Sequence, residues 1–337
     1  MSSSRIRVLV TALGGDLGQA LVKSLRVGET DFEISGCDMD DSGLGRAFVS
    51  RFHSVPSASD AAHYVNAIED LCRRAKNDVI VPASEAEIRV LAKVGQRLPS
   101  GPAVVCQPWS WLQVYGDKLD CMRALEGHLP LAAFADSSDP ETVAKLVEKV
   151  GFPLVVKPRH SSGSRGVRVV KTAEQLRTSI AQLPGSVVQE FIADHDGEFS
   201  VGIFACDHFT EVLAFRRELG PGGASWFAET SEDKAVLDYA LDFAKASGLS
   251  GSANIQMRKN GSSVRLLEVN PRFSSLVAAR AICGFRDAEW SIQTALGLPV
   301  SPPPKNYGKI RFRRFIHELV DFGNGYHAVP EWAPSPR

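Results

Sequence analysis

The segment Leu154–Val170, LVVKPRHSSGSRGVRVV, passes from an apolar stretch through Lys157 into a loop of serine, glycine and arginine, then returns to a valine-rich stretch. The flanking apolar runs predict two strands joined by this loop. Gly163 and Gly166 permit close backbone approach to a ligand, and the loop amides can line a concave anion site. Lys157 can neutralise phosphate oxygens held there. Taken alone, the segment fits a nucleotide-binding flap and an ordinary hairpin with a solvated lysine equally well.

The composition narrows the class of protein. The chain has 337 residues, 44% of them hydrophobic, which is enough for two or three packed units. Its 38 basic and 39 acidic side chains nearly cancel, so we expect no nucleic-acid or membrane partner. The six cysteines form no C-x-x-C pair, which argues against a zinc knuckle or a disulfide framework. Without a run near the roughly 18 apolar residues of a membrane span or a signal-peptide pattern, the sequence predicts a cytoplasmic protein.

Residues 1–112 alternate between strand-like and helix-like stretches, which is typical of a parallel sheet flanked by helices. The first strand pattern leads into a glycine-containing turn and a helix, as in Rossmann-like domains. Asp38 lies 20 residues after Gly18, about where a dinucleotide-binding domain carries its ribose acid. Leu13 stands at the first position of the glycine fingerprint, so the tight turn lacks its glycine. This disfavours a nicotinamide-dependent oxidoreductase, which we keep as an alternative.

The stretch Ser84–Glu87, SEAE, follows an apolar strand pattern, at the edge where open α/β sheets bind ligands. A capping box accounts for both end residues, because Ser84 can accept from the Glu87 amide while the Glu87 carboxylate reaches back. We favour the cap, and a contribution to a substrate cleft is the alternative.

The pattern changes after residue 112. A helix pattern over residues 115–130 carries Asp117 and Lys118, a second amphipathic helix follows, and the glycine loop lies between two strands. These features predict a small α+β unit over residues 118–190. The chain has no G-x-x-x-x-G-K-[ST] motif, which excludes a P-loop ATPase.

A second informative stretch is Ser252–Phe273, SANIQMRKNGSSVRLLEVNPRF, which predicts two strands joined at Asn260-Gly261. Glu268 and Asn270 are two residues apart and therefore share one face of the second strand. Two oxygen-bearing side chains on one face suit a hard cation such as Mg²⁺ that also binds phosphate oxygens. Gln256 is the candidate for a third oxygen.

The hairpin register decides whether Gln256 can join that site. A two-residue Asn260-Gly261 turn pairs Ala253 with Glu268 and sends Gln256 to the opposite face. A three-residue loop or a bulge pairs Ser252 with Glu268 instead and brings Gln256 to the face of Glu268. If Gln256 is a metal ligand, the sequence predicts this second register; a surface glutamine is the alternative.

Five pieces of the chain, in order, together resemble the ATP-grasp superfamily, and the resemblance covers nearly the whole chain. They are GDK with Lys118, Lys157 with the flap SSGSRGV, VQEFI, GEFS with Glu198, and LLEVNPR. The most similar branch has an amino-terminal domain like that of the carbamoyl-phosphate synthase large subunit and includes many carboxylate-amine ligases. The resemblance implies an α/β fold that is α+β in its carboxyl-terminal part. It also implies a Rossmann-like pre-ATP-grasp domain (1–112), a small lid subdomain (113–190) and a carboxyl-terminal subdomain with a metal site (191–337).

The resemblance also implies which residues bind ATP. The phosphates are expected at two lysines and the flap: Lys118, Lys157, Ser162, Gly163, Ser164 and Gly166. The adenosine is expected at a hinge between two subdomains and at a ribose-binding carboxylate: Glu190, the backbone of Phe191 and Ile192, and Glu198.

The metal and the reacting groups are expected beside the phosphates. Glu268 and Asn270 resemble the metal-bridging pair of the superfamily, and Gln256 is similar to a third ligand. Arg272 matches the arginine that stabilises phosphate charge. Arg217, on a strand that runs into a Gly-rich loop, is a candidate to hold a substrate carboxylate through a bidentate contact. A solvated strand-end arginine is the alternative.

The implied chemistry is an ATP- and Mg²⁺-dependent ligation, with Mn²⁺ as an alternative metal. A carboxylate becomes a good electrophile once ATP has phosphorylated it, and an amine can then attack the acylphosphate. We expect amino-acid-like carboxylate and amine substrates, release of ADP and phosphate, and a homodimer as one assembly. A non-catalytic ATP-binding module is a further alternative, which the presence of Glu268, Asn270 and Arg272 together disfavours.

Overall fold

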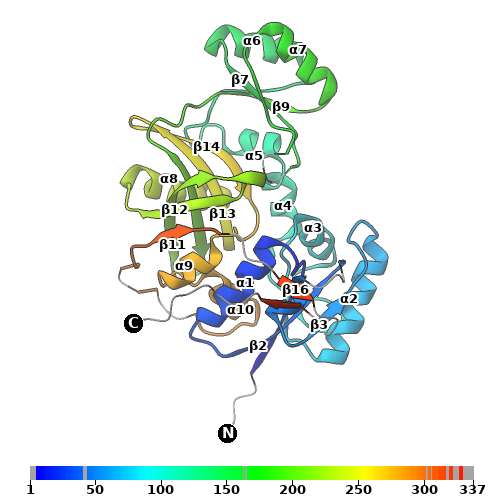
Figure 1. Ribbon diagram of the computed structural model, residues 1–337. Coiled ribbons are helices and arrows are strands. Elements are labelled where there is room, and N and C mark those ends of the chain that lie inside the picture. The colour runs from blue at the N-terminus through cyan, green and yellow to red at the C-terminus, as the bar shows by residue number, and fades with distance from the viewer. Residues whose placement is uncertain are drawn as a thin grey trace.

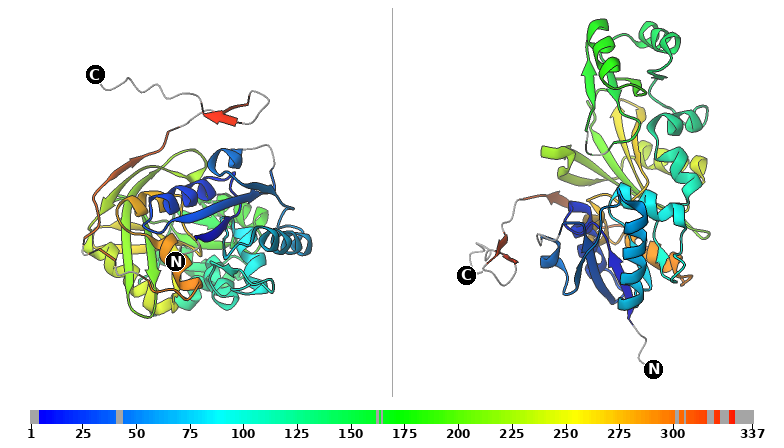
Figure 2. Two further views of the ribbon diagram at one scale, coloured as in Figure 1. Left: turned by 90° about the horizontal axis from the view of Figure 1, so that it is seen from below. Right: turned by 90° about the vertical axis from the view of Figure 1, so that its right-hand side faces the viewer.

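The computed structural model describes residues 5–40, 44–161, 163, 165–300, 303–304, 306–315, 319–321 and 326–328. Within this part of the chain, three sheets follow one another along the long axis of the molecule (Figure 1). The amino-terminal sheet lies at one end, a six-stranded sheet in the middle and a small four-stranded sheet at the other end (Figure 2). The predicted α/β class is confirmed.

The amino-terminal sheet has five parallel strands in the order β3-β2-β1-β4-β5. Val8, Leu9 and Val10 of the central strand are fully buried, as expected for a parallel sheet covered by helices on both faces. The strands are β1 (Ile6–Val10), β2 (Phe32–Asp38), β3 (Phe52–Ser54), β4 (Val79–Val81) and β5 (Ala103–Val104). The helices are α1 (Asp16–Val27), α2 (Ala61–Ala75), α3 (Glu85–Val94) and α4 (Trp109–Tyr115), with a 3₁₀ turn η1 (Leu44–Phe48).

The small sheet is antiparallel, in the order β6-β9-β7-β8, and two helices pack on it. Its strands are β6 (Phe134–Asp136), β7 (Leu154–Lys157), β8 (Arg168–Val170) and β9 (Val187–Glu190). The helices are α6 (Pro140–Val150) and α7 (Ala173–Gln182), and α5 (Lys118–Leu125) precedes them. We call residues 134–190 the lid and residues 158–167, which join β7 to β8, the flap.

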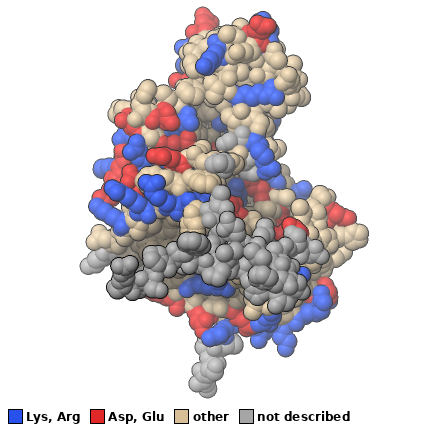
Figure 3. All heavy atoms as spheres, viewed as in Figure 1, with Lys and Arg blue, Asp and Glu red and all other residues tan. Residues whose placement is uncertain are grey.

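The six-stranded sheet is antiparallel, in the order β14-β13-β10-β11-β12-β15. Its strands are β10 (Glu198–Ala205), β11 (Thr210–Leu219), β12 (Ser225–Ser231), β13 (Gly251–Asn260), β14 (Ser263–Asn270) and β15 (Arg311–Arg313). The helices are α8 (Lys234–Ser247), α9 (Val277–Ile282) and α10 (Asp287–Ala295), with a 3₁₀ turn η2 (Pro221–Gly223) and a separate hairpin of β16 (Leu319–Asp321) and β17 (Tyr326–Ala328). Arg311 and Arg313 on the edge strand β15 are exposed. Figure 3 shows basic and acidic side chains interspersed on one face of the molecule. Charges on an edge strand oppose edge-to-edge association.

The hairpin of β13 and β14 answers the register question. Gln256 pairs with Glu268, and Asn254 pairs with Asn270. Directly opposed residues of an antiparallel pair share a face, so Gln256 lies beside Glu268 as the metal interpretation requires. The predicted partner of Glu268 was wrong, because the structure pairs Glu268 with Gln256 and not with Ser252.

The tip of this hairpin also differs from the prediction. Asn260 pairs with Ser263, so Gly261 and Ser262 form the turn, with Gly261 at a φ of +61°. Glycine adopts this left-handed conformation without steric cost. Farther along β14, the register shifts by one residue and leaves Leu267 without a direct partner. This bulge, and not the tip alone, sets the face on which Glu268 lies.

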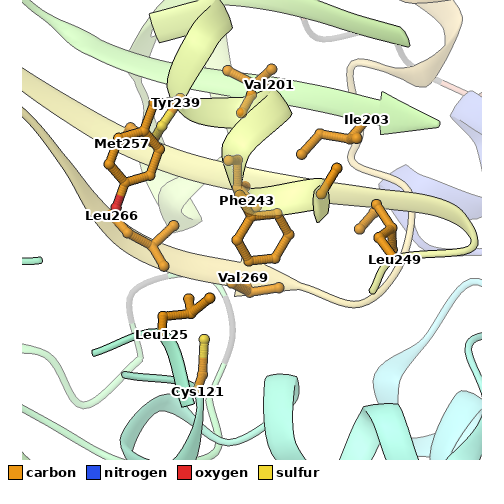
Figure 4. Close-up of a cluster of buried hydrophobic side chains, with 14 of the residues drawn as sticks. Cys121, Leu125, Val201, Ile203, Tyr239, Phe243, Leu249, Met257, Leu266 and Val269 are labelled. Carbon is orange, nitrogen blue, oxygen red and sulfur yellow. The ribbon is translucent and has the colours of Figure 1, made fainter. Parts of the chain in front are cut away.

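Two hydrophobic clusters join elements of the amino-terminal part of the chain to elements of the carboxyl-terminal part, so that they form one body. The larger packs Phe243 of α8 against Val201, Met257 and Val269 of the six-stranded sheet (Figure 4), and it also contains Trp111 of α4. The second joins helix α1 to helices α9 and α10. Its buried members include Leu21, Val22, Val277 and Ile292.

The lid has a separate hydrophobic cluster. Its buried members are Ala135, Val143, Leu146, Leu154, Val156, Val170, Leu176 and Val188. The boundaries predicted near residues 112 and 190 stay predictions, although the three sheets fall on either side of them. Among the described residues, no helix combines the length and apolar character that a bilayer crossing needs.

Candidate active site

A cavity of about 170 Å³ lies between the lid and the six-stranded sheet. Ligand sites commonly lie in such concave spaces between domains. One group of its polar lining residues surrounds the base of the flap: Lys118, Lys157, Ser161, Gln256 and Glu268. A second group of lining residues, both polar and apolar, surrounds the chain that leaves the lid: Glu190, Phe191, Ile192, Glu198, Arg217 and Arg258. The cavity therefore brings together most of the residues that the sequence assigned to ATP.

Lys118 is the first residue of helix α5, and its side chain reaches Glu268, one of the expected metal ligands. Asp117 caps this helix by accepting from the amides of Leu119 (2.9 Å) and Asp120 (3.1 Å). The Lys118 ammonium donates to the Ser161 carbonyl oxygen at 2.7 Å and lies 2.8 Å from Glu268 Oε1. The lysine expected to bind phosphate is therefore paired with the carboxylate expected to bind metal.

Lys157 is the last residue of β7, and only 5% of its surface is exposed. Its ammonium donates to the carbonyl oxygen of Leu267, the bulged residue of β14, at 2.8 Å. Burial lowers the pKa of Lys157 to about 8, the nearby Glu268 opposes this shift, and Lys118 adds to it. Phosphate oxygens would provide the anionic partner that this buried cation needs.

The metal-side residues fit a hard divalent cation with few protein ligands. Glu268 and Gln256 both line the cavity, and the Lys118 ammonium beside Glu268 shows that a cation is stabilised there. Among the described residues, no cluster of three or more His, Cys, Asp or Glu could hold a metal. Mg²⁺ commonly uses one or two carboxylates together with waters and phosphate oxygens. Asn270 shares the face but is only 4% exposed, beside Asn254, and does not line the cavity.

The adenosine side is formed where the chain passes from the lid to the six-stranded sheet. Glu190 Oε2 accepts from the amide of Ala133 at 3.0 Å, and the Glu190 amide donates to the Ala133 carbonyl oxygen. Phe191 and Ile192 follow directly and line the cavity. Glu198 begins β10, with only 8% of its surface exposed. This places the expected hinge and the expected ribose carboxylate on one wall.

Arg217 is not presented to a substrate carboxylate in this structure. Its guanidinium lies 2.8 Å from Glu198 Oε1 and contacts Ser225 Oγ, and its side chain is 6% exposed. A bidentate grip on a substrate would have to displace Glu198. The proposed clamp role of Arg217 stays a prediction, and the solvated alternative does not match its burial.

The flap contains four of the predicted phosphate-binding residues, and two of them, Ser162 and Ser164, lie outside the described residues. Gly166 has a φ of +75°, and a Cβ there would come within 2.8 Å of the Pro158 ring. Gly163 has a φ of +63° and lies against the turn at Gly222. Both glycines therefore meet a backbone requirement that other residues would strain.

A second cleft adjoins the cavity at Ser161, which lines both. Its charged and titratable lining residues are Asp16, Glu85, Arg89, His160, Arg165 and Arg272. Arg272 is paired with Glu85 at 3.0 Å and is not among the residues that line the cavity between the lid and the six-stranded sheet. The structure thus places the predicted phosphate-stabilising arginine at the border of the second cleft.

The capping interpretation of the SEAE stretch is confirmed. The capping box at α3 is present, with Ser84 accepting from the Glu87 amide and Glu87 reaching back. Burial raises the pKa of Glu87, which also accepts from the Thr11 hydroxyl at 2.7 Å. Between the two capping residues, Glu85 faces the second cleft.

The glycine turn before α1 holds no arrangement for a nicotinamide ribose. Asp38 Oδ2 accepts from the Gly14 amide at 2.7 Å, and Asp38 Oδ1 accepts from the Asp40 amide. A Cβ at Gly18 would lie 2.5 Å from the Ala12 carbonyl oxygen. The features that prompted the dinucleotide alternative therefore stabilise the turn itself.

Two features of the site were missed from the sequence. Arg258 lines the cavity and contacts Glu198; its position two residues after Gln256 on one strand was an available signal. The Ser161 carbonyl oxygen receives Lys118, and because this is a backbone contact, no residue type announces it.

Two families have sequence models that match the chain on either side of the cavity. The family described as "ATP-grasp in the biosynthetic pathway with Ter operon" matches residues 182–316. The family described as "Carbamoyl-phosphate synthase L chain, ATP binding domain" matches residues 120–191. The chain is an ATP-grasp protein. The two matches include Lys157, the hinge and Glu268.

Individual relatives of this ATP-grasp protein have low sequence identity to it, but the similarity covers most of each chain. A formate-dependent phosphoribosylglycinamide formyltransferase of Yersinia enterocolitica is 25% identical over 312 residues, 85% of this chain and 78% of that protein. L-amino acid ligase from Bacillus licheniformis has a TM-score of 0.66 at 19% identity, covering 88% of this chain and 75% of the ligase. The biotin carboxylase domain of Hydrogenobacter thermophilus 2-oxoglutarate carboxylase, in complex with MgADP and bicarbonate, has a TM-score of 0.73 at 12% identity, covering 99% and 85%.

This ATP-grasp protein is an ATP- and Mg²⁺-dependent, ADP-forming ligase that joins a carboxylate to an amine through an acylphosphate. The catalytic assignment removes the two alternatives kept from the sequence, an oxidoreductase and a non-catalytic module. The small molecules that it joins are not defined by this class.

Proposed function

We propose that the enzyme joins two small amino-acid-like molecules, one as carboxylate and one as amine, in the cleft beside the ATP cavity. The observation that carries this proposal is the junction at Ser161, which lines both spaces. A carboxylate bound in the cleft would meet the terminal phosphate of ATP at this junction. Reaction between neighbouring sites gains from proximity and orientation.

The charges of the cleft support amino-acid-like substrates. Arg89, Arg165 and Arg272 supply guanidinium groups, which recognise carboxylates in bidentate fashion. Asp16 and Glu85 supply carboxylates in the same cleft, which suit an ammonium group. The likeness to an L-amino acid ligase supports this substrate class at the level of the fold.

We assign the ATP phosphates to Lys118, Lys157 and the flap, and the adenosine to the hinge and Glu198. Glu268 and Gln256 would hold Mg²⁺, and Asn270 would support the same face of β14 from beneath. When bound, Mg²⁺ supplies Lewis-acid stabilisation of charge on the transferred phosphoryl group. The lysines would neutralise further charge on phosphate oxygens, and the flap would exclude water from the product of the first step.

The reaction proceeds in two balanced steps. An oxygen of the substrate carboxylate attacks the γ-phosphorus, the bond to the β-phosphate oxygen breaks, and ADP leaves. The neutral amine then attacks the acyl carbon, the bond from that carbon to the phosphate oxygen breaks, phosphate leaves, and the attacking nitrogen loses one proton to solvent. Arg272, at the cleft border, would stabilise the departing phosphate.

The test is a screen of ATP-dependent phosphate release over pairs of amino acids and small carboxylates, with products identified by mass spectrometry. The proposal predicts equimolar ADP, phosphate and a product whose mass is the sum of the substrates less one water. Turnover with formate or bicarbonate and a phosphorylated amine, but with no amino-acid pair, would overturn the substrate class. The Glu268→Gln variant serves as the inactive control.

A homodimer and a cytoplasmic location stay predictions. Size-exclusion chromatography with light scattering tests the first, and fractionation of the native cell tests the second.

A further inference from the structure

Arg258 connects the two parts of the cavity wall that are assigned to adenosine. Its Nη1 donates to the carbonyl oxygen of Ile192 at 2.9 Å, and its Nε donates to Glu198 Oε2 at 3.0 Å. Its guanidinium also lies over the Phe191 ring, 5.7 Å from the centroid. One side chain of the large sheet thus contacts the hinge backbone, the hinge aromatic and the carboxylate.

The sheet geometry explains how these contacts arise. Glu198 lies directly between Arg217 on β11 and Arg258 on β13, because it pairs with both across the sheet. Directly opposed side chains of antiparallel strands share a face, so the three charges form a row. The row contains two cations and one anion, and the Glu198 side chain is 10% exposed.

The hydrogen bonds leave Glu198 able to bind a ligand. An ionised carboxylate has about four acceptor positions. Arg217 donates twice to Oε1, and Arg258 donates once to Oε2. A fourth position therefore remains for a ribose hydroxyl, and its direction is set by the arginines that fix the carboxylate plane.

We propose that Arg258 is a positioning residue for the adenosine half of ATP, holding the hinge peptide and the Glu198 carboxylate in one fixed relation. This inference rests on the proposed assignment of the hinge and Glu198 to adenosine. Arg258 does not reach the reacting phosphates through any of these contacts, so it acts on nucleotide binding and not on phosphoryl transfer. Arg217 instead donates to Glu198 Oε1 and to Ser225 Oγ, and neither contact involves the hinge.

The test compares Arg258→Met with Arg258→Lys and with the control Arg216→Met. Methionine keeps an apolar stem and removes the guanidinium, whereas lysine keeps the charge but cannot donate in two fixed directions. Arg216 is exposed on the next position of β11, so its replacement removes a charge from the same sheet without touching this row. Steady-state rates are measured with ATP, 2′-deoxy-ATP and 3′-deoxy-ATP.

The inference predicts that Arg258→Met raises KM for ATP about tenfold or more while kcat changes less than about threefold. Wild type should discriminate against at least one deoxy nucleotide, and Arg258→Met should lose most of that discrimination. Arg258→Lys should recover part of the affinity for ATP. Arg216→Met should resemble wild type.

The outcomes separate this inference from the proposed function. If wild type treats all three nucleotides alike, the assignment of Glu198 to ribose fails. If wild type discriminates and Arg258→Met keeps the same ratio, Arg258 has no positioning role and the Glu198 assignment stands. A variant that only lowers the melting temperature, with KM for ATP and the ratio unchanged, would overturn the inference in favour of a structural role. Fluorescence binding of the three nucleotides provides the same comparison if the variant turns over too slowly.

Discussion

The lid and the body beneath it are stabilised in different ways. Every buried member of the lid cluster comes from residues 135–188, so the lid packs around its own core. The body instead contains two clusters that cross between its parts: one packs helices α3 and α4 on the six-stranded sheet, and the other packs the amino-terminal sheet and α1 on helices α9 and α10. The body is therefore one packed unit, and the lid is a second unit with a hydrophobic core of its own. The cavity that we assign to ATP lies where the two meet.

Helix α5 lies between the lid and the body and contributes side chains to the packing of both. Leu119 and Met122 pack with Val187 of the lid, whereas Cys121 and Leu125 belong to the large cluster of the body. Residues three or four apart share a helix face, so the two sets occupy different sides. We expect the lid to rotate about α5 and the linker that follows Glu190.

Two lysines connect the lid side to the body across the cavity. Lys157 reaches the Leu267 carbonyl oxygen, and Lys118 reaches Glu268. Both contacts use groups that we assign to phosphate or metal. ATP binding would exchange these contacts for its own, which couples nucleotide binding to the position of the lid.

The largest expected effect comes from the body. Glu268→Gln should lower kcat by about a thousandfold, because it removes the anionic metal ligand and leaves the fold intact. Coupled assay of ADP release measures the loss, and circular dichroism checks the fold. Glu218→Gln, an exposed residue of β11, is the matched control. Wild-type turnover in Glu268→Gln would remove the metal assignment.

A pair of matched core substitutions tests the difference between lid and body. Leu21 and Leu154 are both fully buried, the first in the shared cluster and the second in the lid. Each change to alanine should lower the free energy of unfolding of the part that contains it by about 2–5 kcal/mol. Hydrogen exchange should accelerate across the lid alone for Leu154→Ala, and across both sheets of the body for Leu21→Ala. Acceleration across the whole chain in both variants would contradict independent packing.

Sequence reasoning predicted the class of fold and most of the site, because the relevant signals are local. Strand periodicity placed Glu268 and Asn270 on one face, and the serine of SEAE placed the start of α3. The hairpin turn was misplaced because tertiary contacts set it. The amide of Gly261 donates to the Asp196 carboxylate, and the Lys259 amide donates to the Gly197 carbonyl oxygen.

The partners of charged residues were the least predictable part. Arg217 was expected to face a substrate, yet its nearest anion comes from a neighbouring strand 19 residues away in sequence. Arg272 was expected among the phosphates, yet it pairs with Glu85, 187 residues away. Such contacts follow from how sheets and helices pack, which no local pattern contains.

A smaller effect is expected from pH. Burial lowers the pKa of Lys157 to about 8 in the nucleotide-free protein, and bound phosphate would favour its charged form. Affinity for a non-hydrolysable ATP analogue should therefore be flat below pH 8 and fall up to about tenfold per pH unit above it. Titration calorimetry from pH 6.5 to 9.5 measures the trend. Lys157→Met should bind weakly with no such pH dependence; an unchanged profile would contradict the contact with phosphate.

The smallest expected effect concerns the metal without nucleotide. The Lys118 ammonium occupies Glu268, so its removal should raise Mn²⁺ affinity in the absence of ATP by about threefold. Electron paramagnetic resonance of free Mn²⁺ measures this for Lys118→Met, with exposed Lys171→Met as the control. Equal Mn²⁺ affinity in Lys118→Met and wild type would show that the ion does not compete for this carboxylate.

The most direct test of the nucleotide site is a crystal structure with a non-hydrolysable ATP analogue and Mn²⁺, with the ion located by anomalous scattering. The account predicts an anomalous peak within about 2.2 Å of the Glu268 carboxylate, phosphates at Lys118 and Lys157, and adenine against Phe191 and Ile192. Nucleotide bound elsewhere would contradict the account. An anomalous peak remote from Glu268, with Lys118 and Lys157 still in contact with Glu268 and Leu267, would also contradict it.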